Sequence, residues 1–101
     1  MFIVVFRAEV LEFDAEYSAT AARMRTLALE RFGCLAFHAV TEGKQEVALS
    51  YWHDEASIRA WRAHPEHVEA QQRGRERWYR TYSVEVTEVR RAYAWPPAQT
   101  P

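Results

Sequence analysis

The chain has 101 residues, of which 49% are hydrophobic and 27% charged, with 13 Lys and Arg residues against 14 Asp and Glu. This length fits a single domain, and a net charge near zero gives no field that would attract nucleic acid or anionic lipid. The apolar run from Phe2 to Phe6 is far shorter than the roughly 20 residues of a membrane-spanning helix or the about 7 residues of a short signal-peptide core. Since the chain has one cysteine and so no internal disulfide, we expect a cytoplasmic protein without membrane or nucleic-acid partners.

The first predicted elements are a strand and a helix. In the run from Phe2 to Val10, every second residue starting with Phe2 is apolar, whereas Arg7 and Glu9 have the other parity, which is typical of a strand with one firmly buried face. Asp14 can cap a helix and Gly33 can end one, and the apolar residues between them recur with helical spacing. This spacing predicts an amphipathic helix from Ala15 to Phe32.

A β-hairpin is predicted after this helix. Two runs rich in apolar, aromatic and β-branched residues, Cys34 to Thr41 and Gln45 to His53, are separated by Glu42-Gly43-Lys44. Both faces of the second run are partly apolar, whereas a sheet with one solvent-exposed face would alternate more cleanly. We therefore expect something other than the chain's own helices to cover the second face of the sheet.

A broken helix comes next. Asp54 can cap a helix that runs through Trp61, and His64-Pro65 interrupts it because proline has no N–H to donate. Pro65 suits the first position of a new helix, which the spacing extends to about Tyr79. Gly74 within that helix costs about 1 kcal/mol relative to alanine, which indicates either a close approach of another backbone or a weak point.

The last predicted element is a long strand that begins near Thr81. Its apolar residues change parity near Thr87-Glu88, which predicts a β-bulge at that point. The strand continues to Tyr93, and its length of about 14 residues exceeds the usual three to ten, so part of it is expected to pair beyond its own sheet. The domain is expected to span residues 1–95, with residues 96–101 as a tail.

The predicted order of elements is strand, helix, strand, strand, broken helix, strand. This order is typical of the α+β ferredoxin-like βαββαβ fold, a four-stranded antiparallel sheet with helices on one face. The apolar second face and the overlong last strand together predict a homodimer in which two sheets pack face to face.

A candidate ligand site lies on the broken helix and just after it. Five residues are expected to line one cavity between the helices and the sheet: Trp61, His64, Gln71, Arg75 and Trp78. A largely aromatic cavity with a few polar groups suits a planar organic molecule. Core packing of the tryptophans, an exposed Gln71 and a capping role for His64 are the alternatives.

Metal and nucleophile chemistry lack the residues that they need. His64 and His67 are three apart, but Pro65 breaks the helix between them and no third ligand has suitable spacing, so no metal site is predicted. The sequence has neither a glycine-rich phosphate loop after a strand nor a nucleophile elbow around a serine. Cys34 has no evident base nearby, which favours a buried thiol over a nucleophile.

Short motifs in the second half of the chain carry a family resemblance. They are Ser50-Tyr51-Trp52, Trp61-Arg62, His67, Ala70-Gln71, Gly74-Arg75, Trp78-Tyr79 and the strand from Tyr82 to Tyr93. Together they resemble the antibiotic biosynthesis monooxygenase domain family, and the resemblance covers Met1 to Trp95. It implies a dimeric α/β barrel, in which two ferredoxin-like protomers pack their sheets together and the last strand contacts the partner.

The resemblance implies one of two activities. One branch of the family oxidises polycyclic phenols to quinones with molecular oxygen and neither metal nor flavin, because the substrate's own conjugated anion supplies the electron. In this chain Trp61 and Trp78 would stack on the ring. Arg75, Gln71 and His67 would stabilise the anion or accept the proton. His67 is then the group expected to titrate near neutral pH.

The other branch degrades haem, with an asparagine near the end of the first strand, a tryptophan on the second helix and an iron-binding histidine ten residues later. Trp61 matches the tryptophan, but Arg7 and Gln71 stand at the other two positions. Glutamine cannot replace imidazole as the iron ligand. A cofactor-free monooxygenase for a small aromatic phenol or quinol is therefore favoured. Non-enzymatic ligand binding, a haem protein and a purely structural dimer are the alternatives.

Overall fold

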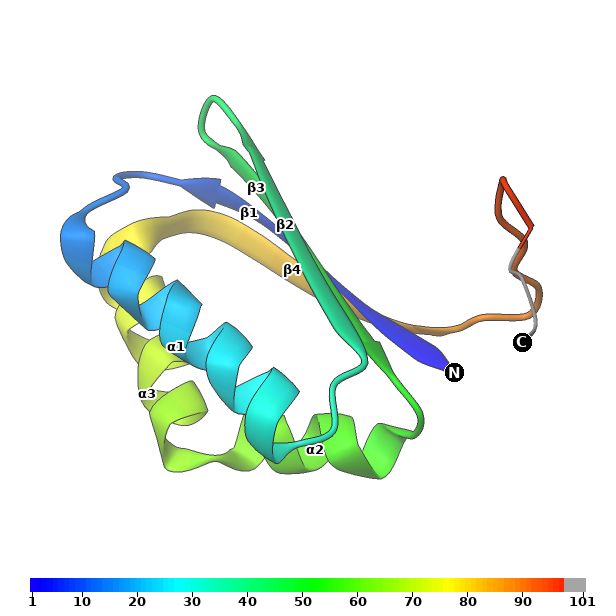
Figure 1. Cartoon of the computed structure of the whole chain (residues 1–101). Coiled ribbons are helices and arrows are strands. Elements are labelled where there is room, and N and C mark those ends of the chain that lie inside the picture. The colour runs from blue at the N-terminus through cyan, green and yellow to red at the C-terminus, as the bar shows by residue number, and fades with distance from the viewer. Residues whose placement is uncertain (98–101) are drawn as a thin grey trace.

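The computed structural model describes residues 1–97 and contains one sheet and one layer of helices (Figure 1). Its elements, in chain order, are β1 (Phe2–Val10), α1 (Ala15–Arg31), β2 (Ala36–Glu42), β3 (Gln45–Trp52), α2 (Glu55–Ala63), α3 (Pro65–Arg73), the π-helical turn η1 (Gly74–Trp78) and β4 (Tyr79–Glu88). The sheet has four strands in the order β2-β3-β1-β4, and each neighbouring pair is antiparallel. The predicted ferredoxin-like fold is therefore confirmed.

Local signals in the sequence set the ends of the helices. The Tyr17 N–H donates a hydrogen bond to the Asp14 carboxylate at 2.7 Å, and Gly33 follows α1 with a φ of 76°. Pro65 occupies the first turn of α3, where the N–H that proline lacks would have no partner within the helix. The predicted cap of α1 and the predicted break between α2 and α3 are both confirmed.

The last strand differs from its prediction. The final helix stops at Arg73 and continues as η1, and β4 has 10 residues and ends at Glu88. The strand ends there because Glu88 pairs with Phe2, the first residue of its partner β1. The bulge predicted at Thr87-Glu88 is wrong: the register shifts at the start of β4, around Arg80.

Gly74 opens η1 at a point of close approach. A Cβ atom at this position would overlap the ring of Tyr79. A close approach was predicted, but the neighbour is a side chain rather than another backbone. The absence of a Cβ makes room for a ring that lines the cavity described below.

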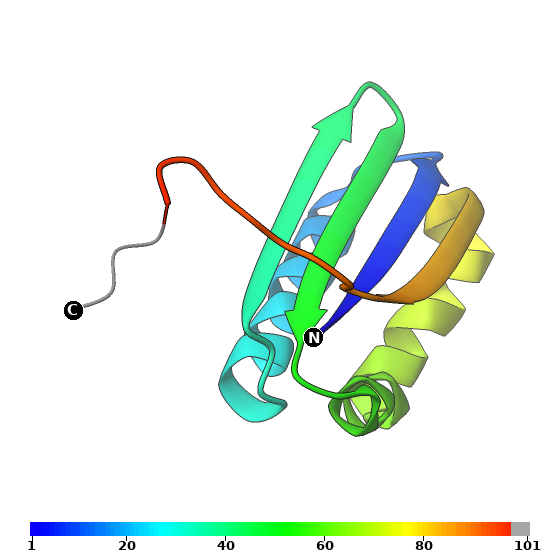
Figure 2. The same ribbon diagram turned by 90° about the vertical axis from the view of Figure 1, so that its right-hand side faces the viewer.

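The sheet has two faces of different composition. Residues that pair directly across antiparallel strands share a face, so Val4, Ser50 and Val86 lie together on the face that the helices cover. Within residues 1–97 no helix covers the opposite, outer face (Figure 2). An apolar row runs across that outer face: Ile3, Val5, Val47, Leu49 and Tyr51.

The segment after β4 leaves the sheet. The Val89 N–H donates to the Met1 carbonyl at 2.9 Å, and the following residues run away from the body of the protein (Figure 1). Tyr93 and Trp95 are 93% and 89% exposed. Within residues 1–97 no strand lies beside residues 89–93, and β4 ends at Glu88, so the expected pairing of this segment beyond its own sheet stays a prediction. The two large aromatic side chains of this segment, Tyr93 and Trp95, are therefore exposed to solvent.

Several predictions about the chain as a whole are only partly tested. No helix within residues 1–97 is long and apolar enough to cross a membrane. Cys34 is buried, its Sγ–H donates to the Ala36 carbonyl at 3.2 Å, and burial raises the pKa of the thiol, as expected of a buried small hydrophobe. The homodimer, the boundary at residue 95 and the cytoplasmic location stay predictions, and residues 98–101 of the predicted tail lie outside the described residues.

The core between the sheet and the helices consists of two hydrophobic clusters. The buried residues of the first, the α2-end cluster, are Val4, Leu27, Ala28, Cys34, Trp52, Ile58 and Trp61. The buried residues of the second, the hairpin-end cluster, are Ala8, Val10, Tyr17 and Trp78, and partly buried Phe6, Tyr79 and Tyr82 pack against them. The second cluster lies near the β2–β3 turn, because the Val10 N–H donates to the Lys44 carbonyl at 2.8 Å.

Candidate functional site

A cavity of about 310 Å³ lies between the helix-covered face of the sheet and the helices α1 and α3. Its walls include Trp61 from the α2-end cluster and Tyr17 and Trp78 from the hairpin-end cluster. Five alanines also line it: Ala21, Ala22, Ala39, Ala48 and Ala70. Larger apolar side chains at these positions would fill the space to the usual density of a protein core. The predicted cavity is therefore present, and small residues create it.

Trp61 forms one wall of the cavity from α2. The side chain is 6% exposed, and its Nε1–H donates to the Met24 carbonyl of α1 at 3.1 Å. The ring also packs against Trp52, with centroids 5.3 Å apart. Because the N–H is already bonded to the backbone, the indole offers a ligand its hydrocarbon surface and its π-system rather than a donor.

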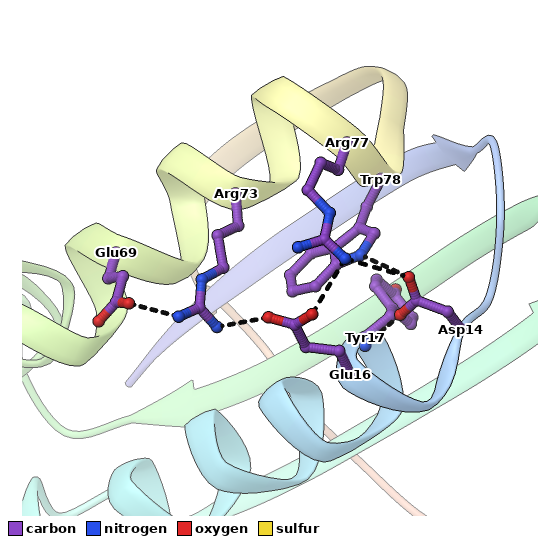
Figure 3. Close-up of polar contacts among 7 residues, drawn as sticks. All are labelled: Asp14, Glu16, Tyr17, Glu69, Arg73, Arg77 and Trp78. Atoms are coloured by element: carbon purple, nitrogen blue, oxygen red, sulfur yellow. Dashed lines mark hydrogen bonds and ion pairs between the residues drawn. The ribbon is translucent and has the colours of Figure 1, made fainter.

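Trp78 forms the opposite wall from η1. The side chain is 2% exposed, and its Nε1–H donates to the Asp14 carboxylate at 3.3 Å (Figure 3). The hydrogen bond from the Tyr17 N–H holds the pKa of Asp14 below its usual range, so this carboxylate stays ionised and keeps accepting. Asp14 thus fixes both the start of α1 and the orientation of the Trp78 ring.

An ionic ladder ties α1 to α3 and η1 across the outer side of the helices. Glu69 pairs with Arg73 at 2.5 Å, Arg73 with Glu16 at 2.9 Å, Glu16 with Arg77 at 2.9 Å, and Arg77 with Asp14 at 3.5 Å (Figure 3). These side chains are roughly a third to three-fifths exposed, so each pair stabilises the fold weakly. The ladder nevertheless joins the helices that cover the cavity.

His67 faces the cavity from α3. Its ring meets Trp61 edge-on with centroids 4.5 Å apart, and its buried Nδ1 has no hydrogen-bond partner among the residues described. Burial, followed by the nearby charge of Arg62, lowers the pKa of His67 from 6.5 to about 4. The expected titration near neutral pH is therefore wrong, because desolvation disfavours the imidazolium. At pH 7 the side chain is a neutral imidazole.

Gln71 lies one helical turn after His67 and also lines the cavity. The next residue, Gln72, is exposed and pairs with Glu76 at 3.4 Å on the outside of the helix. Gln71 is half-buried, so it is the glutamine that brings an amide to the cavity wall.

His64 and Arg75, also expected at the cavity, lie elsewhere. His64 is the N-cap of α3, where its Nδ1 accepts a hydrogen bond from the Glu66 N–H at 3.1 Å, as the capping alternative predicts. Arg75 is exposed, and its guanidinium donates to the Tyr82 hydroxyl at 3.1 Å. Since Tyr82 lines the cavity, Arg75 reaches the site through that hydroxyl.

The structure also brings to the cavity residues that were not predicted there. Glu46 lines the cavity from β3, near Tyr17 and Tyr79, and its charge helps to raise the pKa of both phenols, although burial is the larger cause. Strand parity carries the signal that could have found Glu46, because it shares a face with Ala48 and Ser50. The position of Arg25 and Arg62 at the same cavity has no comparable signal in the sequence.

The residues at the positions that matter for haem do not fit that cofactor. Arg7 points to the outer face of the sheet, where it pairs with Glu85 at 2.7 Å, and so does not reach the cavity. Gln71 holds the position of the iron-binding histidine, and an amide does not replace imidazole as the iron ligand. Within residues 1–97, no three His, Cys, Asp or Glu side chains are grouped to hold a metal ion.

Comparison with protein families agrees with this arrangement. Residues 1–73 match the sequence model of the family described as antibiotic biosynthesis monooxygenase. The chain belongs to this family. The resemblance drawn from the short motifs is thereby confirmed. The matched residues include β1 to α3 and hence most of the cavity wall.

Individual relatives of this family member extend over nearly the whole chain. YqjZ, an uncharacterized protein of Bacillus subtilis (strain 168), is 37% identical over 91 residues, which are 89% of this chain and 80% of that protein. SnoaB, a cofactor-independent oxygenase from Streptomyces nogalater, has a TM-score of 0.75 and 19% identity, covering 94% of this chain and 96% of its own. Rv0793 from Mycobacterium tuberculosis has a TM-score of 0.75 and 15% identity, covering 92% and 98%. At these identities the two structures show a shared fold.

Proposed function

We propose that this protein is a cofactor-independent monooxygenase that binds a small phenol or quinol in the cavity. The observation that carries the proposal is an apolar space of about 310 Å³ bounded by the rings of Trp61 and Trp78. This volume lies near the lower end of the range for small-molecule sites, about 300 to 1,000 Å³, which suits a ligand of two or three fused rings. Membership of the monooxygenase family and the fold shared with SnoaB support oxygenation as the reaction.

The proposed reaction needs no electron source other than the substrate. A hydroxyarene and O₂ give a quinone and water. One oxygen atom replaces the hydrogen of a ring carbon, and the other leaves as water with that hydrogen and the hydroxyl hydrogen. The substrate supplies all the electrons that O₂ accepts. The protein therefore has to hold a flat ring, favour its anion and exclude bulk water.

The cavity residues divide these tasks in the proposal. Trp61 and Trp78 hold the ring between them, and the Gln71 amide donates to the developing phenolate oxygen. His67, neutral at pH 7, accepts the hydrogen bond of the substrate hydroxyl. Arg75 is a positioning residue, because it acts through the Tyr82 hydroxyl.

The basicity of His67 decides how the proton leaves. A phenol of pKa about 10 and an imidazole of pKa about 4 differ by about 8 kcal/mol in proton affinity. Full proton transfer to His67 is therefore unfavourable, and the imidazole orients the hydroxyl instead. The reaction rate should follow the ionisation of the phenol itself, rising with pH without levelling off above pH 6.5.

Oxygen uptake with hydroxylated naphthalenes and anthrones tests the proposal. The protein should consume O₂ with at least one of them, and Trp61→Phe and His67→Ala should each slow the uptake tenfold or more. His53→Ala is the matched control for His67→Ala, because the exposed His53 side chain does not line the cavity. Binding of these compounds without any uptake would contradict the enzyme and favour the alternative of a ligand-binding protein.

We further propose a homodimer that buries the outer face of the sheet. An apolar row on that face and the exposed rings of Tyr93 and Trp95 support a second copy as the cover. Light scattering should give twice the 11.9 kDa of one chain, and Leu49→Asp should reduce that mass. A stable mass near 11.9 kDa for the unmodified chain would refute the dimer.

A further inference from the structure

The cavity has an acidic end and a basic end. Glu46 lies opposite Ala8 and Thr41 in the sheet register, beside the hairpin-end cluster. Arg25 and Arg62 also line the cavity, and both belong to the other end. The Arg25 Cζ lies 6.0 Å from the centroid of the Phe37 ring, and Phe37 packs against the α2-end cluster. Arg62 follows Trp61 on α2.

The sheet register gives the distance between the two ends. Phe37 pairs with Ser50, and Glu46 lies four residues before Ser50 on β3. At about 3.3 Å per residue the two rows are about 13 Å apart. Opposite charges therefore stand at the two ends of an apolar space rather than beside one another.

These charges are not matched by neighbouring side chains. The Thr41 hydroxyl donates to one carboxylate oxygen of Glu46, and no ion pair joins Glu46, Arg25 or Arg62 to any other residue in the described part of the chain. The arginines on the outer side of the same helices differ: Arg23 pairs with Glu66 at 3.1 Å, and the ladder holds Arg73 and Arg77. Arg25 is exposed, and Arg62 and Glu46 are half-buried, so their charged groups are accessible to a ligand that enters the cavity.

We infer that the ligand of the cavity is a flat hydroxyaryl carboxylate whose anionic group lies at Arg25 and Arg62. One hydroxyl reacts at His67 as proposed above, and a second hydroxyl donates to Glu46. This inference rests on the proposed function and narrows its substrate class. A guanidinium binds a carboxylate with two parallel hydrogen bonds, and a carboxylate such as Glu46 accepts but does not donate. The ring system spans the space between Trp61 and Trp78, and the reacting position faces His67 and Gln71 on α3.

Calorimetric titration with three two-ring probes tests the inference: 6-hydroxy-2-naphthoate, 2-naphthoate and 2-naphthol. The first should bind roughly tenfold or more tightly than 2-naphthol, as expected for added hydrogen bonds to charged groups. Glu46→Gln should weaken the binding of 6-hydroxy-2-naphthoate about tenfold and leave the affinity for 2-naphthoate unchanged. Arg62→Gln should weaken the binding of both naphthoates and leave the affinity for 2-naphthol unchanged.

The matched controls are Glu42→Gln on the same hairpin and Arg59→Gln on the same helix, because neither side chain lines the cavity. Equal affinity for all three probes, unaffected by Glu46→Gln and Arg62→Gln, would overturn the inference and leave the proposed function standing. Failure of every probe to bind the unmodified protein would overturn both. The comparison among probes on the unmodified protein does not depend on whether a variant folds.

Discussion

The two ends of the core are packed in different ways. In the α2-end cluster Trp52, Leu27 and Ala28 have no exposed surface, and aliphatic side chains fill the gaps between rings. At the hairpin end Tyr17 meets Trp78 and Tyr79 edge-on, at centroid distances of 5.4 and 6.0 Å. Alanines line the space between these rings and Trp61. The α2-end cluster therefore holds the fold together by close packing, and the space for a ligand lies between its Trp61 wall and the rings of the hairpin-end cluster.

Removing the largest side chain of the filled end should have the largest effect. Trp52→Ala deletes a fully buried ring whose Nε1–H donates to the Ser50 hydroxyl at 2.8 Å, so the free energy of unfolding should fall by about 4 kcal/mol. Trp95→Ala, which truncates a ring that is 89% exposed, should change it by about 0.5 kcal/mol or less in a monomer. Urea denaturation measures both free energies, and similar losses for the two variants would contradict the role of Trp52 in the filled end of the core.

The cavity should make stability depend on pH through His67, which lies against Trp61. Because the pKa of His67 is about 4 in the folded chain and 6.5 when unfolded, the unfolded chain binds more protons between these values. Stability should therefore fall by about 3 kcal/mol as the pH drops from 6.5 to 4. His67→Gln should remove this part of the slope, and identical pH profiles for the two proteins would show that the imidazole is not buried.

Asp14 links the start of α1 to the cavity wall. Its substitution should lower the stability of the fold less than the loss of Trp52. Asp14→Ala removes the helix cap and the acceptor of the Trp78 N–H, which should lower the Tm by a few degrees and change Trp78 fluorescence. Asp14→Asn keeps a good cap and should recover most of the Tm. Equal losses for the two variants would mean that the charge, rather than the cap, is what matters.

The ionic ladder should contribute less to the stability of the fold than Trp52, His67 or Asp14. Arg73→Gln breaks its pairs with Glu16 and Glu69, and exposed pairs of this kind stabilise by about 1 kcal/mol at most. The Tm should fall less than in Asp14→Ala, and added salt should shrink the difference. A large decrease in Tm that does not depend on salt would mean that the ladder is buried, for example in an interface with a second copy of the chain.

The elements follow from the sequence where local rules decide them. Asp14, Gly33 and Pro65 each set a helix end through their own backbone chemistry, and the structure has those ends where they were predicted. The end of β4 could not be predicted in this way. The end of β4 depends on where the partner strand β1 begins. The alternation of apolar residues within residues 81–93 carries no information about that position.

The site follows from the sequence only in part, for the same reason. Trp61, Gln71 and Trp78 line the cavity as expected from their spacing, and His67, which only the family resemblance placed at the reaction site, lines it too. Pro65 restarts the helix in a new phase, so His64 becomes a cap and His67 faces the cavity. The pKa of His67 depends on burial by segments distant in the chain, so its reference value near neutral pH was a poor guide.

Filling the cavity tests its role as the ligand site most directly. Ala48→Leu places a larger side chain on the floor of the cavity, opposite Phe6 and Ala39. Calorimetric binding of 2-naphthol should be lost in Ala48→Leu and kept in Ala56→Leu, a control at an exposed position of α2. A folded Ala48→Leu protein that binds 2-naphthol as tightly as the unmodified chain would contradict the account.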